Sequence, residues 1–571
     1  MSNFTSDRSP DLGGMRLMLL ISKSIIISLI IIVVISGDNE SISNMMRNDL
    51  TLISAQIILL GLCILDFRKI DRELNLSIYQ IILISSLIIV LAYAGHRLVL
   101  AGYNCVRDEQ MADFDAFIYG HGHLAWPLPL AWQNDASALN LQFMLPVSKP
   151  VAWVSSYLPM NAGFRALAGS VADPALSGPI FAGLSFPMLW ACGRRIWPDD
   201  NEKVVVALLL LACSGQVLMM GMTAYAMPAY LFFNLLWLWL FLNNRVRTDL
   251  AALLVGFVAT GLHQPLFHPL FAVPFVFLLL IERRWPRLAL FVFGYAIIST
   301  FWLAWPHIIH GLVTGPQSTT ASGGVDYQSR LVGALSQNNR NVTLMAENIL
   351  RFFAWQHILL LPLMLASAKT IRRDRLAGAL AMGFVLPIIV MAVILPWQGF
   401  GFGYRYLHGV IGNAVLLGAY GWRHLAGLHD QLRPYLLRAS AAGVFVILPM
   451  QAWLAHETYR PFAQLSEQVD ASGVDYVIMG RTNLAEASSL VTNRPDLSNR
   501  PIRLYADDIG NVGAFAKRIC HGRTLVALTT DSFFKPAALY FNVRPLPDSS
   551  SHSSALADLL KVNGCKVSSL R

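Results

Sequence analysis

The chain has 571 residues, of which 55% are hydrophobic and 13% are charged, and its mean hydropathy is +0.51. Soluble domains carry about 25% charged residues, so the composition excludes an ordinary soluble protein and predicts a polytopic α-helical membrane protein. The net charge of +9 does not indicate a nucleic-acid partner, because the basic residues are concentrated in alternate loops.

Apolar windows that could cross a bilayer, which takes about 17–25 residues, recur over the first 455 positions. The first window is rich in Ile and has no clear small-residue cleavage site, which favours an uncleaved signal anchor over a signal peptide. We expect about thirteen transmembrane helices, some of them short. They lie near 17–36, 50–65, 77–96, 174–193, 203–221, 227–243, 249–262, 267–281, 288–306, 347–367, 376–396, 407–422 and 435–455.

The loops between these spans differ in charge from one side to the other. Short loops on one side hold little more than Arg47 and Arg405. Because basic loops remain in the cytoplasm, the pattern predicts an inner (plasma) membrane protein with a cytoplasmic N-terminus and an extracytoplasmic or periplasmic C-terminal domain. The loops expected in the cytoplasm carry Arg68, Lys69, Arg72, Arg194, Arg195, Lys203, Arg245, Arg247, Arg283, Arg284, Arg287, Lys369, Arg372, Arg373, Arg375, Arg423, Arg433 and Arg438.

The chain divides into three parts. Residues 1–76 hold an N-terminal tail and two extra transmembrane helices, and residues 77–455 form the membrane core, including a large outer loop at 97–173. That loop is too polar to span the membrane, and several prolines interrupt its apolar residues. We therefore expect short interfacial helices, anchored at the interface by Trp126, Trp132, Trp153 and Tyr157.

Residues 456–571 have the composition of a soluble domain. Strand-like segments at 474–479, 502–505 and 524–529 alternate with helical segments, which predicts a small α/β domain. Cys520 and Cys565 lie in this exported part, and two cysteines in an oxidising compartment usually pair. We expect a disulfide between them, the alternative being two free thiols.

Asp108 and Glu109 form an acidic pair just beyond the third span, in a loop that also contains Asp113 and Asp115. Ionisable groups near lipid are costly and are usually functional. A carboxylate here could act as a general base on an acceptor hydroxyl or amine, or help to bind a divalent cation. The alternative is that the pair only caps an interfacial helix.

A glycine-rich run, Gly399-Phe-Gly-Phe-Gly-Tyr-Arg-Tyr-Leu-His408, follows the eleventh span on the outer side. Its three alternating glycines allow a close backbone approach, and Arg405 stands between Tyr404 and Tyr406. The arginine fork suits phosphate oxygens, so we predict a phosphate-binding turn. An arginine that anchors the helix at the interface is the alternative.

Further candidates are supported by position alone. His263 and His268 border a tight outer turn, but their spacing across a proline matches no standard metal pair, so a structural turn is equally compatible. Arg165 and Lys149 share the outer loop with the acidic pair and could neutralise a phosphate, or anchor the loop at the interface. His408 closes the glycine-rich run.

Together these features resemble the GT-C superfamily of polyprenyl-phosphate-sugar-dependent glycosyltransferases, especially the bacterial proteins related to protein O-mannosyltransferases and lipid A aminoarabinose transferases. The resemblance rests on the multi-spanning body, the Asp108–Glu109 motif in the first large outer loop, and an outer C-terminal part. It covers about 77–455. Two extra spans precede the acidic loop, which in that family usually follows the first span. Asp326 is the only carboxylate in 307–346, so a role for a divalent metal ion is left open.

The resemblance implies an inverting transfer on the outer face of the membrane. Asp108 would be the general base, with Glu109 as a helper, and Arg405 would hold the phosphate of a polyprenyl-phosphate-linked sugar donor. The acceptor is left open between a lipid, a glycan and a protein. The alternatives are a transporter or flippase of a lipid-linked or anionic substrate, in which Asp108 and Arg405 would line a pathway, and a non-catalytic assembly scaffold.

Overall fold

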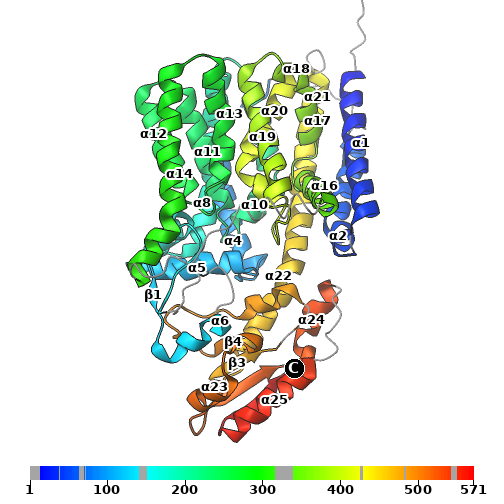
Figure 1. Cartoon of the computed structure of the whole chain (residues 1–571). Coiled ribbons are helices and arrows are strands. Elements are labelled where there is room, and N and C mark those ends of the chain that lie inside the picture. The colour runs from blue at the N-terminus through cyan, green and yellow to red at the C-terminus, as the bar shows by residue number, and fades with distance from the viewer. Residues whose placement is uncertain are drawn as a thin grey trace, which may run out of the picture.

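The computed structural model of the chain describes residues 13–37, 39–63, 70, 73–139, 144, 151–314, 338–424, 429–480, 482, 484–541 and 549–571. A bundle of long helices forms the upper part of the molecule in Figure 1, and a smaller domain with a sheet lies below it. Helix α5 (Arg107–Gly120) lies across the base of the bundle, between these two parts. The predicted interfacial helix therefore lies at the boundary between the bundle and the soluble domain.

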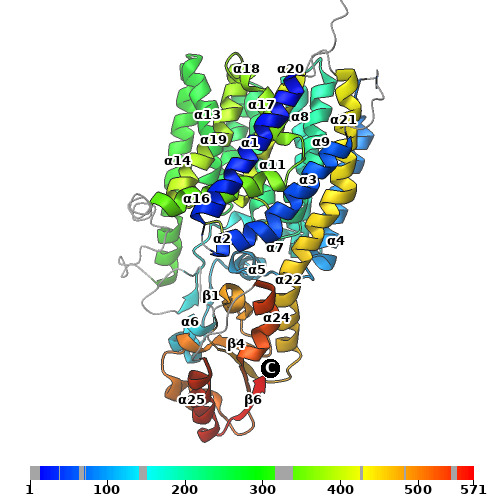
Figure 2. The ribbon, with the colours of Figure 1, turned by 90° about the vertical axis from the view of Figure 1, so that its right-hand side faces the viewer.

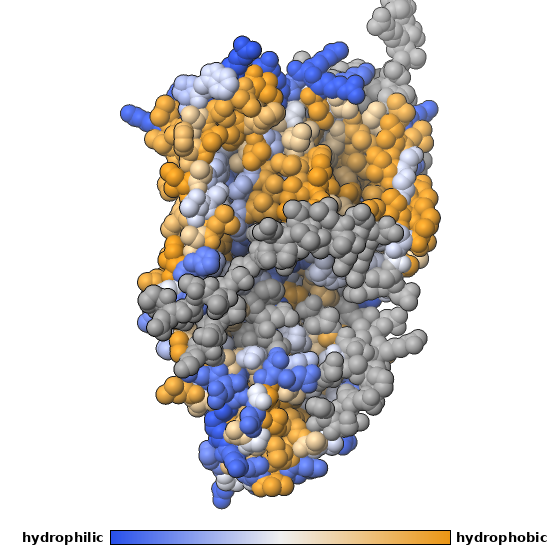
Figure 3. Space-filling model, viewed as in Figure 1, coloured by the Kyte–Doolittle hydropathy of each residue, from blue (hydrophilic) through white to orange (hydrophobic). Residues whose placement is uncertain are grey.

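Hydrophobic side chains cover much of the bundle face seen in Figure 3, hydrophilic side chains lie at its top, and the lower domain shows both kinds. Seven described helices are long and apolar enough to cross a membrane, and an eighth span arises if the bent pair α9 and α10 is counted as one. The bundle comprises α4 (Ile78–Leu98), α8 (Ser177–Ile196), α9 (Asn201–Ala212), α10 (Gly215–Gly221), α11 (Met227–Leu242), α12 (Val246–Thr260), α13 (Phe267–Ile281), α14 (Trp285–Thr314), α17 (Leu360–Ala366), α18 (Ala368–Ile371), α19 (Arg375–Ile394), α20 (Ile411–His424) and α21 (His429–Ala442).

Helix length and hydropathy identify seven or eight spans among the described residues, so they do not confirm the expected count of about thirteen. Most of the expected segments are nevertheless helical. Helices α11, α12, α13 and α20 have 14 to 16 residues. At 1.5 Å per residue such a helix measures about 21–24 Å, which is less than the 30 Å hydrocarbon core. The expected span at 347–367 is divided between α16 (Asn338–Ala354) and α17, so it is not one helix.

The two extra N-terminal helices, α1 (Gly13–Ser36) and α3 (Leu50–Cys63), lie in front of the bundle in Figure 2, joined by α2 (Asn39–Asn44) and a short π-helix, η1 (Met45–Asp49). Helix α1 packs on α16 and α17. Arg351 of α16 contacts the buried Asp49 at 3.2 Å and Glu347 at 2.6 Å. Arg351 thus links the N-terminal helices to α16 through two carboxylates, which favours a fixed position for these helices.

The π-helix η5 (Gly443–Ile447) follows α21. Helix α22 (Leu448–Asp470) follows η5 and extends from the bundle into the lower domain. There, four parallel strands form a sheet in the order β4 (Ile502–Tyr505), β3 (Tyr476–Met479), β5 (Leu525–Thr529), β6 (Lys566–Leu570). The three predicted strands are confirmed, whereas β6 was not predicted. The helices of the domain are α23 (Val512–Ile519), α24 (Asp531–Phe541) and α25 (Ser549–Val562).

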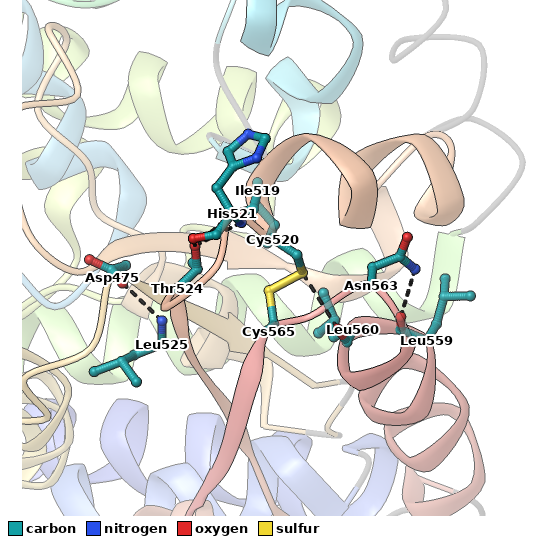
Figure 4. Close-up of a disulfide and its surroundings, with 10 residues drawn as sticks. All are labelled: Asp475, Ile519, Cys520, His521, Thr524, Leu525, Leu559, Leu560, Asn563 and Cys565. Carbon is teal, nitrogen blue, oxygen red and sulfur yellow. Dashed lines mark hydrogen bonds between the residues drawn. A yellow bond between two sulfur atoms is a disulfide. The ribbon is translucent and has the colours of Figure 1, made fainter.

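Cys520, after α23, and Cys565, before β6, form the expected disulfide (Figure 4), which closes a loop of 45 residues. Constraining a loop of this length in the unfolded chain stabilises the domain by about 4 kcal/mol in the chain-entropy account. We expect Cys520→Ser to lower the free energy of unfolding of the domain by about that amount, measured by thermal unfolding of the purified protein. Identical mobility of the alkylated protein on reducing and non-reducing gels would contradict the bond.

Candidate active site

The N-terminus of α5 is fixed to the soluble domain, and this fixes the position of Asp108. Arg107 donates to the carbonyl oxygens of Val491 (2.9 Å) and Ser488 (2.8 Å), and Gln110 donates to that of Ser489 (2.7 Å). The acceptors lie at the end of the short helix η6 (Ala485–Leu490) and just after it. These hydrogen bonds hold the first turn of α5 against η6. Asp108 lies between the two donor residues in the sequence.

Asp108 receives two hydrogen bonds from side chains that are distant in the sequence. The Nη1 of Arg405 donates to Oδ2 at 2.6 Å, and the hydroxyl of Tyr157 donates to Oδ1. The pair is largely buried, with 14% of the Asp108 side chain and 9% of the Arg405 side chain exposed. Burial alone would raise the pKa of Asp108, but the charge of Arg405 and the bond from Tyr157 hold it below its usual value. Asp108 is therefore ionised at neutral pH.

Arg405 begins the 3-10 helix η4 (Arg405–Val410) and is positioned by the glycine-rich run. Gly403 has a φ of +67°, and a Cβ there would lie 2.3 Å from Oε1 of Gln216, so only glycine fits. Gln216 donates to the carbonyl oxygen of Tyr404 at 2.8 Å, and the backbone N–H of Arg405 donates to Gln398 at 2.8 Å. The turn is thus held on both sides of Arg405.

Aromatic rings enclose the charge of Arg405. The guanidinium carbon lies 5.0 Å from the ring centre of Tyr225 and 5.3 Å from that of Tyr406, within cation–π range. Tyr157 is packed edge-on against His263, with ring centres 4.6 Å apart. Burial lowers the pKa of His263. Its Nδ1 has no hydrogen-bond partner among the described residues.

A small cavity of about 20 Å³, which we call the Asp108 cavity, adjoins these groups, and that volume holds roughly one water molecule. Asp108, Asp115, Tyr157, Tyr225 and His263 line it. Burial raises the pKa of Asp115 to about 7. Tyr225 was not identified from the sequence, because a single tyrosine in a turn between apolar segments carries no pattern of its own.

The other predicted site residues do not gather around Asp108. His268 bonds to Asn234 and Tyr295, each at 2.7 Å, inside the bundle. Arg165 pairs with Asp113, on α7 (Met160–Val171) and α5. Tyr404, which precedes Arg405, and His408, three residues after it, are both fully buried. Lys149 and Asp326 lie outside the described residues.

Glu109 does not line the Asp108 cavity. Its side chain is fully buried and accepts a hydrogen bond from the hydroxyl of Tyr459 at 2.9 Å and from the backbone N–H of Val106 at 3.3 Å. Burial, the largest cause, raises the pKa of Glu109 to about 8. These contacts support a role in joining α5 to α22 rather than a direct role in transfer.

This raised pKa predicts how stability depends on pH. Between the unfolded value of 4.5 and the folded value of about 8, the folded protein keeps a proton that the unfolded chain has lost. The free energy of unfolding should therefore fall as pH rises through this interval, by at most about 1.4 kcal/mol per pH unit from this one group. Thermal unfolding measured against pH should show a shallower slope in Glu109→Gln, and an unchanged slope would refute the assignment.

In the described ranges, no three His, Cys, Asp or Glu side chains gather where they could hold a metal ion. The structure is that of a multi-spanning membrane protein. In it, Asp108 on the interfacial helix α5 contacts Arg405 from the distant glycine-rich turn.

No protein-family model matches the chain, and no curated protein matches it. Among solved structures, it is similar to ArnT from Cupriavidus metallidurans bound to undecaprenyl phosphate, with 11% identity, a TM-score of 0.46, and coverage of 81% of this chain and 88% of that chain. The Archaeoglobus fulgidus oligosaccharyltransferase in complex with Zn and sulfate has 11% identity, a TM-score of 0.40, and coverage of 81% and 67%. At these values the likeness concerns the arrangement of helices alone.

Proposed function

We propose that the chain is an integral membrane glycosyltransferase that moves a sugar from a polyprenyl-phosphate donor to an acceptor, with inversion at the anomeric carbon. The observation that carries this proposal is the buried contact between Asp108 and Arg405 at the base of the helical bundle. It combines a base for an acceptor with a cation for a phosphate. Both lie at the level where a lipid-linked donor would present its head group.

The reaction is a single displacement. The acceptor oxygen or nitrogen forms a bond to the anomeric carbon while its proton passes to Asp108. The bond between that carbon and the phosphate oxygen breaks, and the lipid phosphate leaves with the electron pair. Arg405 stabilises the developing negative charge through its fork of N–H donors. The rings of Tyr225 and Tyr406 contact the guanidinium group and help to hold it beside Asp108.

Donor binding would also activate the base. In the structure, Arg405 donates to Asp108 and contributes to its lowered pKa. A donor phosphate that takes over this guanidinium would bring its own negative charge close to Asp108, and both changes raise the pKa of the carboxylate. The Asp108 cavity holds about one water molecule. The Asp108–Arg405 contact must therefore open for the sugar to enter.

The site belongs to the outer face in this proposal, and the chain to the inner (plasma) membrane with a cytoplasmic N-terminus. Helix α18, which contains Lys369 and is followed by Arg372 and Arg373, lies at the opposite end of the bundle from α5 (Figure 1). Basic loops stay in the cytoplasm, so α5 and the soluble domain would face the extracytoplasmic or periplasmic side. The disulfide of the soluble domain fits an oxidising compartment.

The test is transfer by the purified protein in proteoliposomes supplied with a radiolabelled polyprenyl-phosphate sugar and a membrane extract as the source of acceptor. We expect labelled product together with free polyprenyl phosphate, identified by mass spectrometry. Movement of the intact labelled lipid across the bilayer without product would instead support a flippase or transporter. Binding of the donor with neither movement nor product would support a scaffold.

A further inference from the structure

A second, larger cavity lies on the same interfacial helices. It has a volume of about 450 Å³ and is bounded by the end of α4, the second half of α5, the second half of α7 and the chain just after α7. We call it the α4–α7 cavity. Its walls include Arg97, Asn104, Asp113, Phe117, Arg165 and Asp173. None of the described residues that line the Asp108 cavity lines this one.

The charges of the α4–α7 cavity compensate one another. Arg97 pairs with Asp173 at 2.8 Å, and Arg165, with 3% of its side chain exposed, pairs with Asp113. Besides His96 and His121, the described walls carry two arginines and two carboxylates, and each arginine is bound to a carboxylate. An uncharged ligand can bind here without opening either ion pair, which favours it over a phosphate or carboxylate at this cavity.

Polar groups of both kinds face an aromatic ring in this cavity. The carboxylates accept hydrogen bonds and the guanidinium groups donate them. Phe117 supplies an aromatic wall. A few placed donors and acceptors together with an aromatic surface suit a polyhydroxylated molecule, whose hydroxyls both donate and accept and whose C–H face is apolar.

We propose that the α4–α7 cavity binds an uncharged sugar of the acceptor, so that the acceptor of this protein is a neutral glycan. This inference rests on the proposed function. Asp108 and Phe117 are nine residues apart on α5, which corresponds to about 14 Å along the helix axis and about half a turn around it. The two cavities therefore lie on different faces of α5, and an oligosaccharide with one end in this cavity would have to pass around the helix to bring its other end to Asp108.

Exposed apolar residues that neighbour the cavity wall in sequence indicate how the glycan arrives. Leu98, Leu167 and Val171 are exposed apolar residues, each close in sequence to a residue of the cavity wall. Exposed leucine and valine on an interfacial helix suit contact with lipid. A glycan joined to a lipid would therefore enter from the membrane surface, whereas a soluble oligosaccharide would enter from the aqueous side. Both ligands present the same neutral sugar, so a binding experiment must distinguish the lipid-linked glycan from the soluble oligosaccharide.

Two glycines offer a matched pair of variants. A Cβ at Gly120, in the cavity wall, or at Gly163, on α7 outside it, would meet no atom within 4 Å. Gly120→Trp should fill the cavity without breaking either ion pair, and Gly163→Trp adds the same side chain elsewhere on the interfacial helices. We would screen the full-length protein in nanodiscs on an array of neutral and acidic glycans. The best ligand would then be titrated both as a free oligosaccharide and as a glycolipid.

We expect binding to a neutral glycan that falls at least tenfold in Gly120→Trp and is unchanged in Gly163→Trp. A tighter titration with the glycolipid would identify the membrane as the source. Binding of acidic glycans only, equal loss in both variants, or no glycan binding would overturn the inference. Binding of polyprenyl phosphate is measured in parallel. If it is retained while the glycan result fails, the proposed function stands without this acceptor, and if it is absent, the proposed function itself fails.

Discussion

Replacing Asp108 by Asn is expected to reduce sugar transfer by about 10²–10⁴-fold, the usual contribution of a general base, while the donor phosphate stays bound. The amide keeps the size of the carboxylate and can still accept a hydrogen bond from Arg405 or Tyr157, the two partners of Asp108. It cannot take a proton from the acceptor. Because the variant frees Arg405 from a competing carboxylate, polyprenyl phosphate should bind at least as tightly as to the unchanged protein.

The chain offers a matched control for this substitution. Asp249 is also a buried carboxylate, held by Arg287 through bonds of 2.6 and 2.7 Å, and it does not line the Asp108 cavity. Asp249→Asn should cost stability of a similar kind and leave transfer unchanged. Initial rates with labelled donor and thermal unfolding would be measured for both variants. Full activity in Asp108→Asn would exclude Asp108 as the base, and an equal loss in both variants would indicate a stability effect.

The sequence predicted local structure well where one pattern dominated. The helices near 78–98, 285–314 and 375–394 follow long apolar runs, and three of the four strands follow short runs rich in β-branched or aromatic residues. The number of spans was not predictable in the same way. Helices of about 15 residues, such as α12 and α13, pack against neighbouring helices of the bundle, and these contacts rather than their own length determine their position.

Assembly of the site depended on contacts that no local pattern encodes. The acidic loop and the glycine-rich turn were each recognisable, but 297 residues separate Asp108 from Arg405. The roles expected for Asp108 and Glu109 were similar because the two are adjacent. A helix turns 100° per residue, so adjacent side chains face different surroundings. Asp108 lines a cavity and contacts Arg405, whereas Glu109 is buried against Tyr459.

Replacing Arg405 by Gln is expected to weaken binding of polyprenyl phosphate by about 10- to 150-fold, from the 1.5–3 kcal/mol of a hydrogen bond to a charged group, and to destabilise the fold. The destabilisation arises because Asp108 would remain buried without its cation, which typically costs about 3–5 kcal/mol. The two effects must be separated. Arg433→Gln is the matched control, since Arg433 pairs with the buried Glu202 at 2.6 Å, in a contact between α21 and α9.

The double variant Asp108→Asn/Arg405→Gln distinguishes a broken ion pair from a lost phosphate ligand. Removing both charges leaves neither buried alone, so stability should recover by most of the loss seen in Arg405→Gln, while binding of polyprenyl phosphate stays weak. Arg433→Gln should lose stability and keep binding. Thermal unfolding and titration with polyprenyl phosphate in nanodiscs measure the two quantities on the same samples. If the double variant recovers binding together with stability, Arg405 serves only to neutralise Asp108, and the donor phosphate must be held elsewhere.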